Sequence, residues 1–186
     1  MPARSAGGAH IALLRGINVG GRNKLPMKDL VAMFTDAGCD GVRTYIQSGN
    51  VVFSAKRALA RRVPALITQA IADRLGLRVP LVMRTAAELE KVVAGNPFLR
   101  AGADPKKLHV AFLAKQPTAA RVATLQPDRS PPDEFSVRGR EIYLHCPNGV
   151  ARTKLTNAYF DARLTTTTTV RNWNTVLKLC ELAGGP

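Results

Sequence analysis

The sequence predicts an α+β fold with two halves, each having the element order β-α-β-β-α-β. Short apolar, β-branched runs alternate with segments whose apolar residues recur at helical spacing. Glycine and proline mark the ends of these segments. The same order occurs twice along the 186 residues and is followed by one extra C-terminal helix. This order is the split βαβ arrangement of ferredoxin-like folds, so mixed, mainly antiparallel sheets are expected.

The first half opens with an apolar run at 10–15, flanked by glycines, that predicts a buried strand. After a glycine-rich loop, apolar residues at helical spacing predict a helix over 26–37, with a proline in its first turn and a glycine after its end. The runs at 42–47 and 50–54 are rich in branched and aromatic residues and predict two strands. Ser48-Gly49 between them predicts a two-residue hairpin turn.

A second amphipathic helix is predicted over 63–75, with Pro64 in its first turn and Gly76 at its end. The strand at 77–84 contains Pro80, which lacks a backbone N–H and therefore predicts the edge of a sheet. These elements complete the first ferredoxin-like subdomain, residues 1–84.

The second subdomain, residues 85–186, begins with a linking helix at 85–94, where Thr85 and Glu88 form a capping-box pattern. The remaining pattern repeats the order of the first half and adds a closing helix with apolar residues at i, i+3, i+4 and i+7. The predicted elements are a strand at 107–114, a helix at 117–125, strands at 134–137 and 141–146, a helix at 153–163, a β-branched run at 164–170 and a helix at 172–182.

Basic residues greatly outnumber acidic ones. Lys plus Arg is 27 and Asp plus Glu is 13, so the formal net charge is +14, which predicts anionic partners. Solvated basic helix faces are the alternative explanation of this excess. Residues 15–28, however, carry Arg15, Arg22, Lys24 and Lys28 with no carboxylate, mostly in a loop that helix amphipathicity cannot explain.

Two polar loops are expected to meet at one end of the first half. In a ferredoxin-like unit the first two strands run parallel, so the loop at 15–24 and the turn at 47–50 emerge at the same edge. One loop leads into a helix N-terminus, where backbone N–H groups attract anions. The predicted ligand-binding residues are Arg15, Asn18, Gly20, Gly21, Lys24, Gln47, Ser48 and Asn50, with Lys154, Arg171 and Asn174 completing the pocket.

The alternative is structural: the glycines satisfy turn geometry, and Asn18 and Asn50 cap backbone groups. An RNA-recognition sheet is disfavoured, because the first strand has no aromatic residue and the third offers only Phe53 for stacking. Both alternating sets of the first strand are apolar, which predicts a sheet covered on both faces.

No catalytic or metal-binding pattern stands out. The three histidines lack metal-ligand spacing, and Cys39, Cys146 and Cys180 lack C-x-x-C spacing and are expected to be small buried apolar residues. The sequence predicts no cofactor and no metal, and it does not decide whether the protein is an enzyme. No apolar run is long enough to span a membrane, so a cytoplasmic protein without a membrane partner is expected.

Four segments, 11–21, 44–53, 96–98 and 171–176, resemble motifs of the bacterial family called domain of unknown function 1697. Lys154-Leu155-Thr156 resembles its Ser-Lys-Leu motif, with Thr153 in place of serine. The resemblance covers nearly the whole chain and implies two ferredoxin-like parts. It implies no established activity.

These sequence features are compatible with three functions. The leading hypothesis is an anion-binding protein whose ligand is nucleic acid or a phosphorylated metabolite. The first alternative is an enzyme acting on a phosphorylated or carboxylated small molecule, with Lys24 or Arg15 stabilising charge. The second is a structural or partner-binding homodimer.

Overall fold

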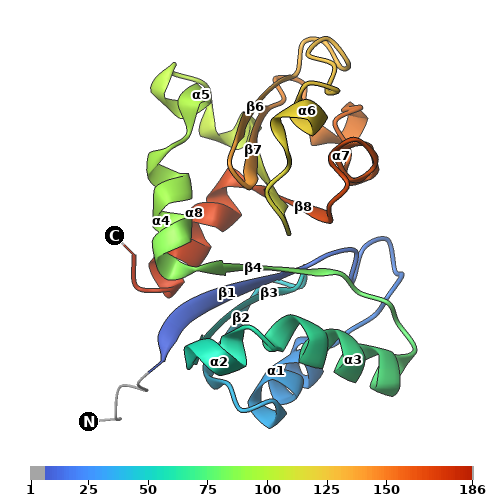
Figure 1. Cartoon of the computed structure of the whole chain (residues 1–186), viewed down its shortest axis with the longest axis vertical. Coiled ribbons are helices and arrows are strands. Elements are labelled where there is room, and N and C mark those ends of the chain that lie inside the picture. The colour runs from blue at the N-terminus through green and yellow to red at the C-terminus, as the bar shows by residue number, and fades with distance from the viewer. Residues whose placement is uncertain (1–6, 186) are drawn as a thin grey trace. The chain divides into compact units, whose positions relative to one another are not determined.

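The computed structural model describes residues 7–185, and contacts divide this part of the chain into two units (Figure 1). One unit contains residues 7–90 and 179–185, and the other contains Lys91–Lys178. The division of the sequence into domains 1–84 and 85–186 stays a prediction. No helix in the described chain has both the length and the apolar character needed to cross a membrane.

The first unit is a four-stranded antiparallel sheet with helices on one face (Figure 1). Its strands lie in the order β2-β3-β1-β4, so β4 is at an edge, as Pro80 predicted. The elements are β1 (Gly8–Leu14), α1 (Met27–Asp36), β2 (Asp40–Tyr45), β3 (Asn50–Ala55), α2 (Arg57–Ala60), α3 (Val63–Leu75) and β4 (Leu81–Thr85), with α4 (Ala86–Ala94) beginning directly after β4.

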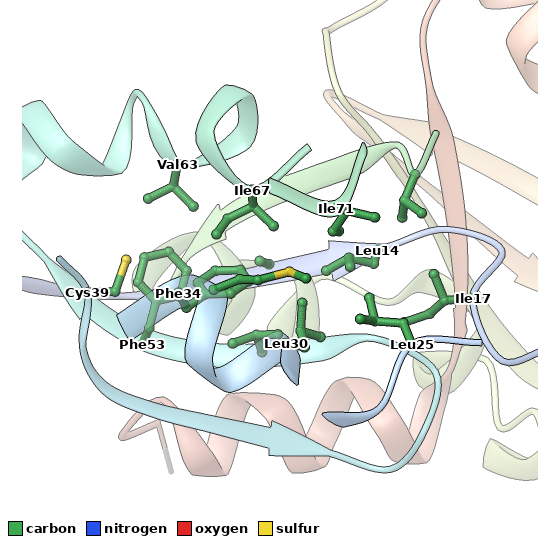
Figure 2. Close-up of a cluster of buried hydrophobic side chains, with 14 of the residues drawn as sticks. Leu14, Ile17, Leu25, Leu30, Phe34, Cys39, Phe53, Val63, Ile67 and Ile71 are labelled. Carbon is green, nitrogen blue, oxygen red and sulfur yellow. The ribbon is translucent and has the colours of Figure 1, made fainter. Parts of the chain in front are cut away.

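The core of the first unit lies between the sheet and helices α1 and α3 (Figure 2). Phe34 of α1 contacts Phe53 of β3 with ring centroids 5.1 Å apart, and Ile67 of α3 is fully buried in the same cluster. Leu14, Ile17 and Leu25 are buried together at one end of this core. The loop that follows β1 is therefore anchored by apolar side chains at both of its ends.

The second unit repeats the arrangement. Its sheet has the order β6-β7-β5-β8 with every neighbouring pair antiparallel, which confirms the predicted α+β class with two similar halves and an extra C-terminal helix. The elements are α5 (Pro97–Arg100), β5 (Leu108–Leu113), α6 (Ala119–Val122), β6 (Glu134–Arg138), β7 (Glu141–His145), α7 (Asn157–Leu164) and β8 (Thr168–Asn172), with short 3-10 helices at Pro105–Lys107 and Val150–Arg152. The C-terminal helix α8 (Trp173–Leu182) begins in this unit, and its residues from 179 onward are assigned to the first unit.

Strand register reveals equivalent residues in the two sheets. His10 of β1 lies opposite Thr85, and His109 of β5 lies opposite Asn172. In the next pair, Ile11 faces Arg84 and Val110 faces Arg171. Thr85 and Asn172 each accept a hydrogen bond from a backbone N–H in the first turn of the following helix. The two sheets thus place a histidine at equivalent positions and a buried arginine, Arg84 or Arg171, at the next pair.

Several predicted boundaries are wrong. The hairpin loop has four residues, 46–49, rather than two, because Tyr45 pairs with Asn50. The helix expected at 117–125 is only the single turn α6, and the short helix α2 was not predicted. The helix expected at 153–163 begins after Thr156, whose hydroxyl caps the backbone N–H of Tyr159 at 3.2 Å. Polar side chains that satisfy the first helical N–H groups set such starts.

Both faces of β1 are covered, as the apolar pattern predicted. Ile11 and Leu13 on one face, and Ala12 and Leu14 on the other, are fully buried. All three cysteines are buried and free of disulfides, as expected.

We expect the stability of the protein to fall as pH drops below about 6.5, in part through His109. This side chain is buried, its Nδ1 has no hydrogen-bond partner in the described chain, and burial lowers its pKa. The unfolded chain therefore binds the proton more readily, so the neutral histidine contributes stability above the ordinary pKa that is lost as pH falls through that value toward the folded pKa. Urea unfolding at about pH 8 and about pH 5.5 measures this loss.

His109→Leu is expected to lose less stability than the wild type over the same interval, whereas His145→Leu serves as the control because His145 is only half-buried. Equal losses in the wild type and His109→Leu would contradict this account.

Candidate functional site

The loop after β1 and the turn after β2 lie side by side. Asn18 Nδ2 donates a hydrogen bond of 2.8 Å to the carbonyl of Gln47, which is 29 residues away. The backbone N–H of Leu14 also donates to the carbonyl of Gly49 at 2.9 Å. The predicted convergence of these two segments is therefore confirmed. Residues 15–26 and 46–49 are called the paired loops below.

The side chain of Asn18 connects the paired loops through hydrogen bonds. Its Nδ2 also donates to the carbonyl of Leu25 at 2.8 Å, and its Oδ1 accepts from the backbone N–H of Leu25 at 2.8 Å. It has a positive φ of 53°, which asparagine tolerates better than most residues. The protein itself thus occupies both polar atoms of this amide, which gives Asn18 a positioning role.

Gly20 and Gly21 form the tip of a small hairpin within the first loop. The backbone N–H of Arg22 donates to the carbonyl of Val19 at 3.0 Å, closing a turn around the two glycines. Their φ angles of 55° and 74° follow the type I′ pattern. A Cβ at either position would meet nothing within 4 Å, so turn geometry rather than crowding explains both glycines.

Hydrogen bonds also close the base of this hairpin. The backbone N–H of Asn18 donates to the carbonyl of Asn23 at 3.1 Å, and Asn23 Nδ2 donates to the carbonyl of Gly16 at 2.8 Å. Asn23 was not among the predicted residues, although asparagine between turn glycines and a lysine is a recognisable turn signal. The loop therefore has a defined, hydrogen-bonded conformation with Gly20 and Gly21 at its tip.

The conformation of the second loop is stabilised by hydrogen bonds from the side chain of Asn50. Asn50 is fully buried, and its Nδ2 donates to the carbonyl of Tyr45 at 3.0 Å and to Ser48 Oγ at 2.9 Å. A fully buried amide cannot touch a ligand in this conformation. Asn50 thus shapes the turn, whereas the side chain of Gln47 is exposed.

The basic side chains of the first loop are presented to solvent. Arg22, Lys24 and Lys28 are exposed, and within residues 7–185 none of the three makes an ion pair. Arg15 is half-buried, and its backbone N–H donates to the carbonyl of Pro80 at 2.9 Å. The paired loops therefore carry positive charge at Arg22 and Lys24, and the start of α1 carries it at Lys28, without an ion pair to a described carboxylate.

The start of α1 adds backbone donors. Pro26 occupies the N-cap without a side-chain capping bond, and Asp29 is in the first turn. The backbone N–H groups of Met27 and Lys28 have no hydrogen-bond partner in the described chain. Such groups favour negative charge in front of the helix.

The other three predicted residues belong to the second unit. Lys154 is exposed and its backbone N–H donates to Ser130 Oγ at 3.0 Å, while Asn174 is exposed in the first turn of α8. Arg171 is only 8% exposed and donates from NH1 to Thr169 Oγ1 at 2.8 Å and to the carbonyl of Val170 at 2.9 Å. Burial lowers its pKa to about 10, so it stays charged at neutral pH. Their membership of one pocket with the paired loops stays a prediction.

Thiol chemistry has no support in the ionisation of the cysteines. Burial, with a smaller effect of Asp40, raises the pKa of Cys39 to about 11. Burial and then Asp133 raise the pKa of Cys146 to about 11, and burial raises that of Cys180. These thiols are protonated at neutral pH, and a thiolate is the form that acts as a nucleophile. Among residues 7–185, no group of three or more His, Cys, Asp or Glu is placed to hold a metal ion.

A protein family and a solved structure are similar to this chain. A family model described as "Protein of unknown function (DUF1697)" matches residues 8–143, which confirms the resemblance seen in the motifs. The chain is similar to the solved structure of the conserved bacterial protein SP0830 from Streptococcus pneumoniae, with a TM-score of 0.71 and 22% sequence identity. That likeness covers 96% of this chain and 99% of the other and shows a shared fold. A search of curated proteins finds no match.

Proposed function

We propose that this chain, which belongs to the DUF1697 family of proteins of unknown function, binds the phosphate backbone of a nucleic acid at the paired loops. One observation carries the proposal: Asn18 holds the two loops together while Arg22 and Lys24 of the first loop are exposed and make no ion pair in the described chain. Phosphates are contacted mainly by arginine, lysine and backbone N–H groups. The exposed Arg22 and Lys24, and the open N–H groups at the start of α1, supply these donors.

The shape of the loops favours a polymer over a small enclosed metabolite. The hairpin tip is exposed on both sides of Gly20 and Gly21, so a ligand there lies over a surface. Two apolar side chains are also exposed on the paired loops, Val19 at 65% and Ile46 at 50%. Apolar contacts beside cations suit the sugars and bases of a nucleic acid, which a lone phosphate lacks.

The sheet face is not the proposed binding surface. Ile11, Leu13 and Val52 are buried, so they cannot serve as the open platform on which RNA-recognition sheets stack bases. Binding at an edge built from loops leaves the sheets to their structural role. It also agrees with the net charge of +14, which favours association with polyanions in general.

Fluorescence anisotropy with a labelled single-stranded oligonucleotide tests the proposal, using RNA and DNA of the same sequence. If two or three cations contact phosphates, the affinity should fall about 7- to 18-fold between roughly 50 and 200 mM salt, because bound counterions are released. No binding at the lower salt concentration would reject the proposal. Tight binding of a mononucleotide with no gain from a longer strand would replace it with a phosphorylated metabolite as the ligand.

A further inference from the structure

A cavity of about 410 Å³ lies within the second unit and is lined by none of the residues of the paired loops. It is formed by the turn that precedes β6 and by the segment between β7 and α7. Its volume is within the usual range of small-molecule sites. The lining is mixed, with prolines and an alanine beside hydroxyl, amide and charged groups, among them Ser130, Asp133, Asn148, Arg152 and Thr153.

The polar wall of the cavity is preorganised. Ser130 Oγ donates a hydrogen bond of 2.8 Å to Asp133 Oδ2 and accepts one of 3.0 Å from the backbone N–H of Lys154. Ser130 and Asp133 are each only 8% exposed. These bonds fix the position of the Asp133 carboxylate without using its second oxygen.

Asp133 carries an uncompensated charge. No ion pair to Asp133, and no hydrogen bond to its Oδ1, is present in the described chain. A carboxylate removed from water is costly unless donors or an opposite charge approach it. The lining of the cavity therefore includes a carboxylate with one oxygen that no described group donates to.

Arg152 supplies the opposite charge on the same lining. It is exposed, and it makes no ion pair with Asp133 or with another carboxylate of the described residues. One cavity is thus bordered by a carboxylate and a guanidinium that are not paired with each other. A molecule that binds both groups needs a positive and a negative end.

We propose that this cavity binds a free α-amino acid, with its ammonium group at Asp133 and its carboxylate at Arg152. Charge-assisted hydrogen bonds form at both ends, and an arginine fork can accept a carboxylate through two donors. Ser130 holds the aspartate in place and acts as a positioning residue. The site is independent of nucleic-acid binding at the paired loops, since it uses none of their residues.

Calorimetric titration of the full chain with the standard amino acids, one at a time, tests this proposal. At least one amino acid should bind. Its amide, which lacks the carboxylate, and its N-acetyl derivative, which lacks the ammonium, should each bind about tenfold more weakly or worse. Absence of binding by every amino acid, or binding of either derivative as tightly as the parent amino acid, would overturn the proposal.

Matched variants locate the site. Asp133→Asn keeps an acceptor for Ser130 but removes the charge, and Arg152→Gln changes an exposed side chain that the fold does not need. Each should weaken binding about tenfold or more, while Arg121→Gln, an exposed arginine of α6 outside the lining, should not. Should Asp133→Asn fail to fold, Arg152→Gln decides alone, and its binding with wild-type affinity would reject the proposed orientation.

Discussion

Gly49→Ala is expected to lower the free energy of unfolding by about 2–5 kcal/mol, because backbone strain and a steric clash add at this position. Gly49 has a φ of 78°, in the left-handed region that disfavours any residue with a Cβ. An added Cβ would also lie 2.7 Å from the Cβ of Leu14 and 2.8 Å from Cδ1 of Ile17, closer than real contacts allow. Both neighbours are fully buried parts of the core and cannot simply swing away.

Gly41→Ala is the matched control, since Gly41 also has a positive φ, of 57°, but an added Cβ there would meet nothing within 4 Å. Urea unfolding of both variants separates strain from crowding, with Gly41→Ala expected to lose only about 1–2 kcal/mol. Equal losses in the two variants would show that the close approach of Gly49 to Leu14 and Ile17 has no energetic weight.

The consequence of Gly49→Ala should reach the proposed binding surface. Ile17 lies in the first loop next to Asn18, and Gly49 ends the second loop, so a displacement of either shifts the segments that Asn18 connects. The packing of one glycine thus links the stability of the core to the geometry of the paired loops.

The double variant Arg22→Gln/Lys24→Gln is expected to weaken oligonucleotide binding about tenfold or more at low salt, because two phosphate contacts are lost. The dependence of log K on log salt should become shallower by about 1.5, the value for two fewer released counterions. Both residues are exposed, so the free energy of unfolding should change by less than about 0.5 kcal/mol. Anisotropy titrations over a range of salt concentrations measure the first two quantities.

Arg61→Gln/Arg62→Gln provides the control for net charge. These two exposed arginines lie in the turn between α2 and α3, and their replacement removes the same formal charge from the same unit. A comparable loss of affinity in this control would mean that binding follows overall charge and that the paired loops are not the site.

Local signals determined much of the fold. Helix α3 runs over Val63–Leu75 as predicted, with Pro64 in its first turn and Gly76 in the left-handed conformation at its end. The capping box at α4 forms in both directions, from Glu88 N–H to Thr85 Oγ1 and from Thr85 N–H to Glu88 Oε2. Such features depend on residues within one helical turn, so the sequence carries them directly.

The meeting of the paired loops was also predictable, because chain connectivity in a βαββαβ unit places both at one sheet edge. The roles of their residues were not. Asn18 and Asn50 were proposed as ligand contacts, yet their amides hold backbone groups in place, as the structural alternative stated.

Whether the amide of an asparagine contacts a ligand or a backbone carbonyl depends on which backbone groups the fold brings near it. The distances between the amide and these groups are not encoded in a pattern of residue types. The same holds for the cavity at Asp133, whose wall joins residues 130–133 with residues 148–153. The sequence by itself determined most of the helices and strands, the α+β class with two similar halves and the basic character of one loop, since these follow from neighbouring residues and connectivity. Only the tertiary structure decided which polar groups are hydrogen-bonded within the protein, because that depends on distances between segments far apart in the chain.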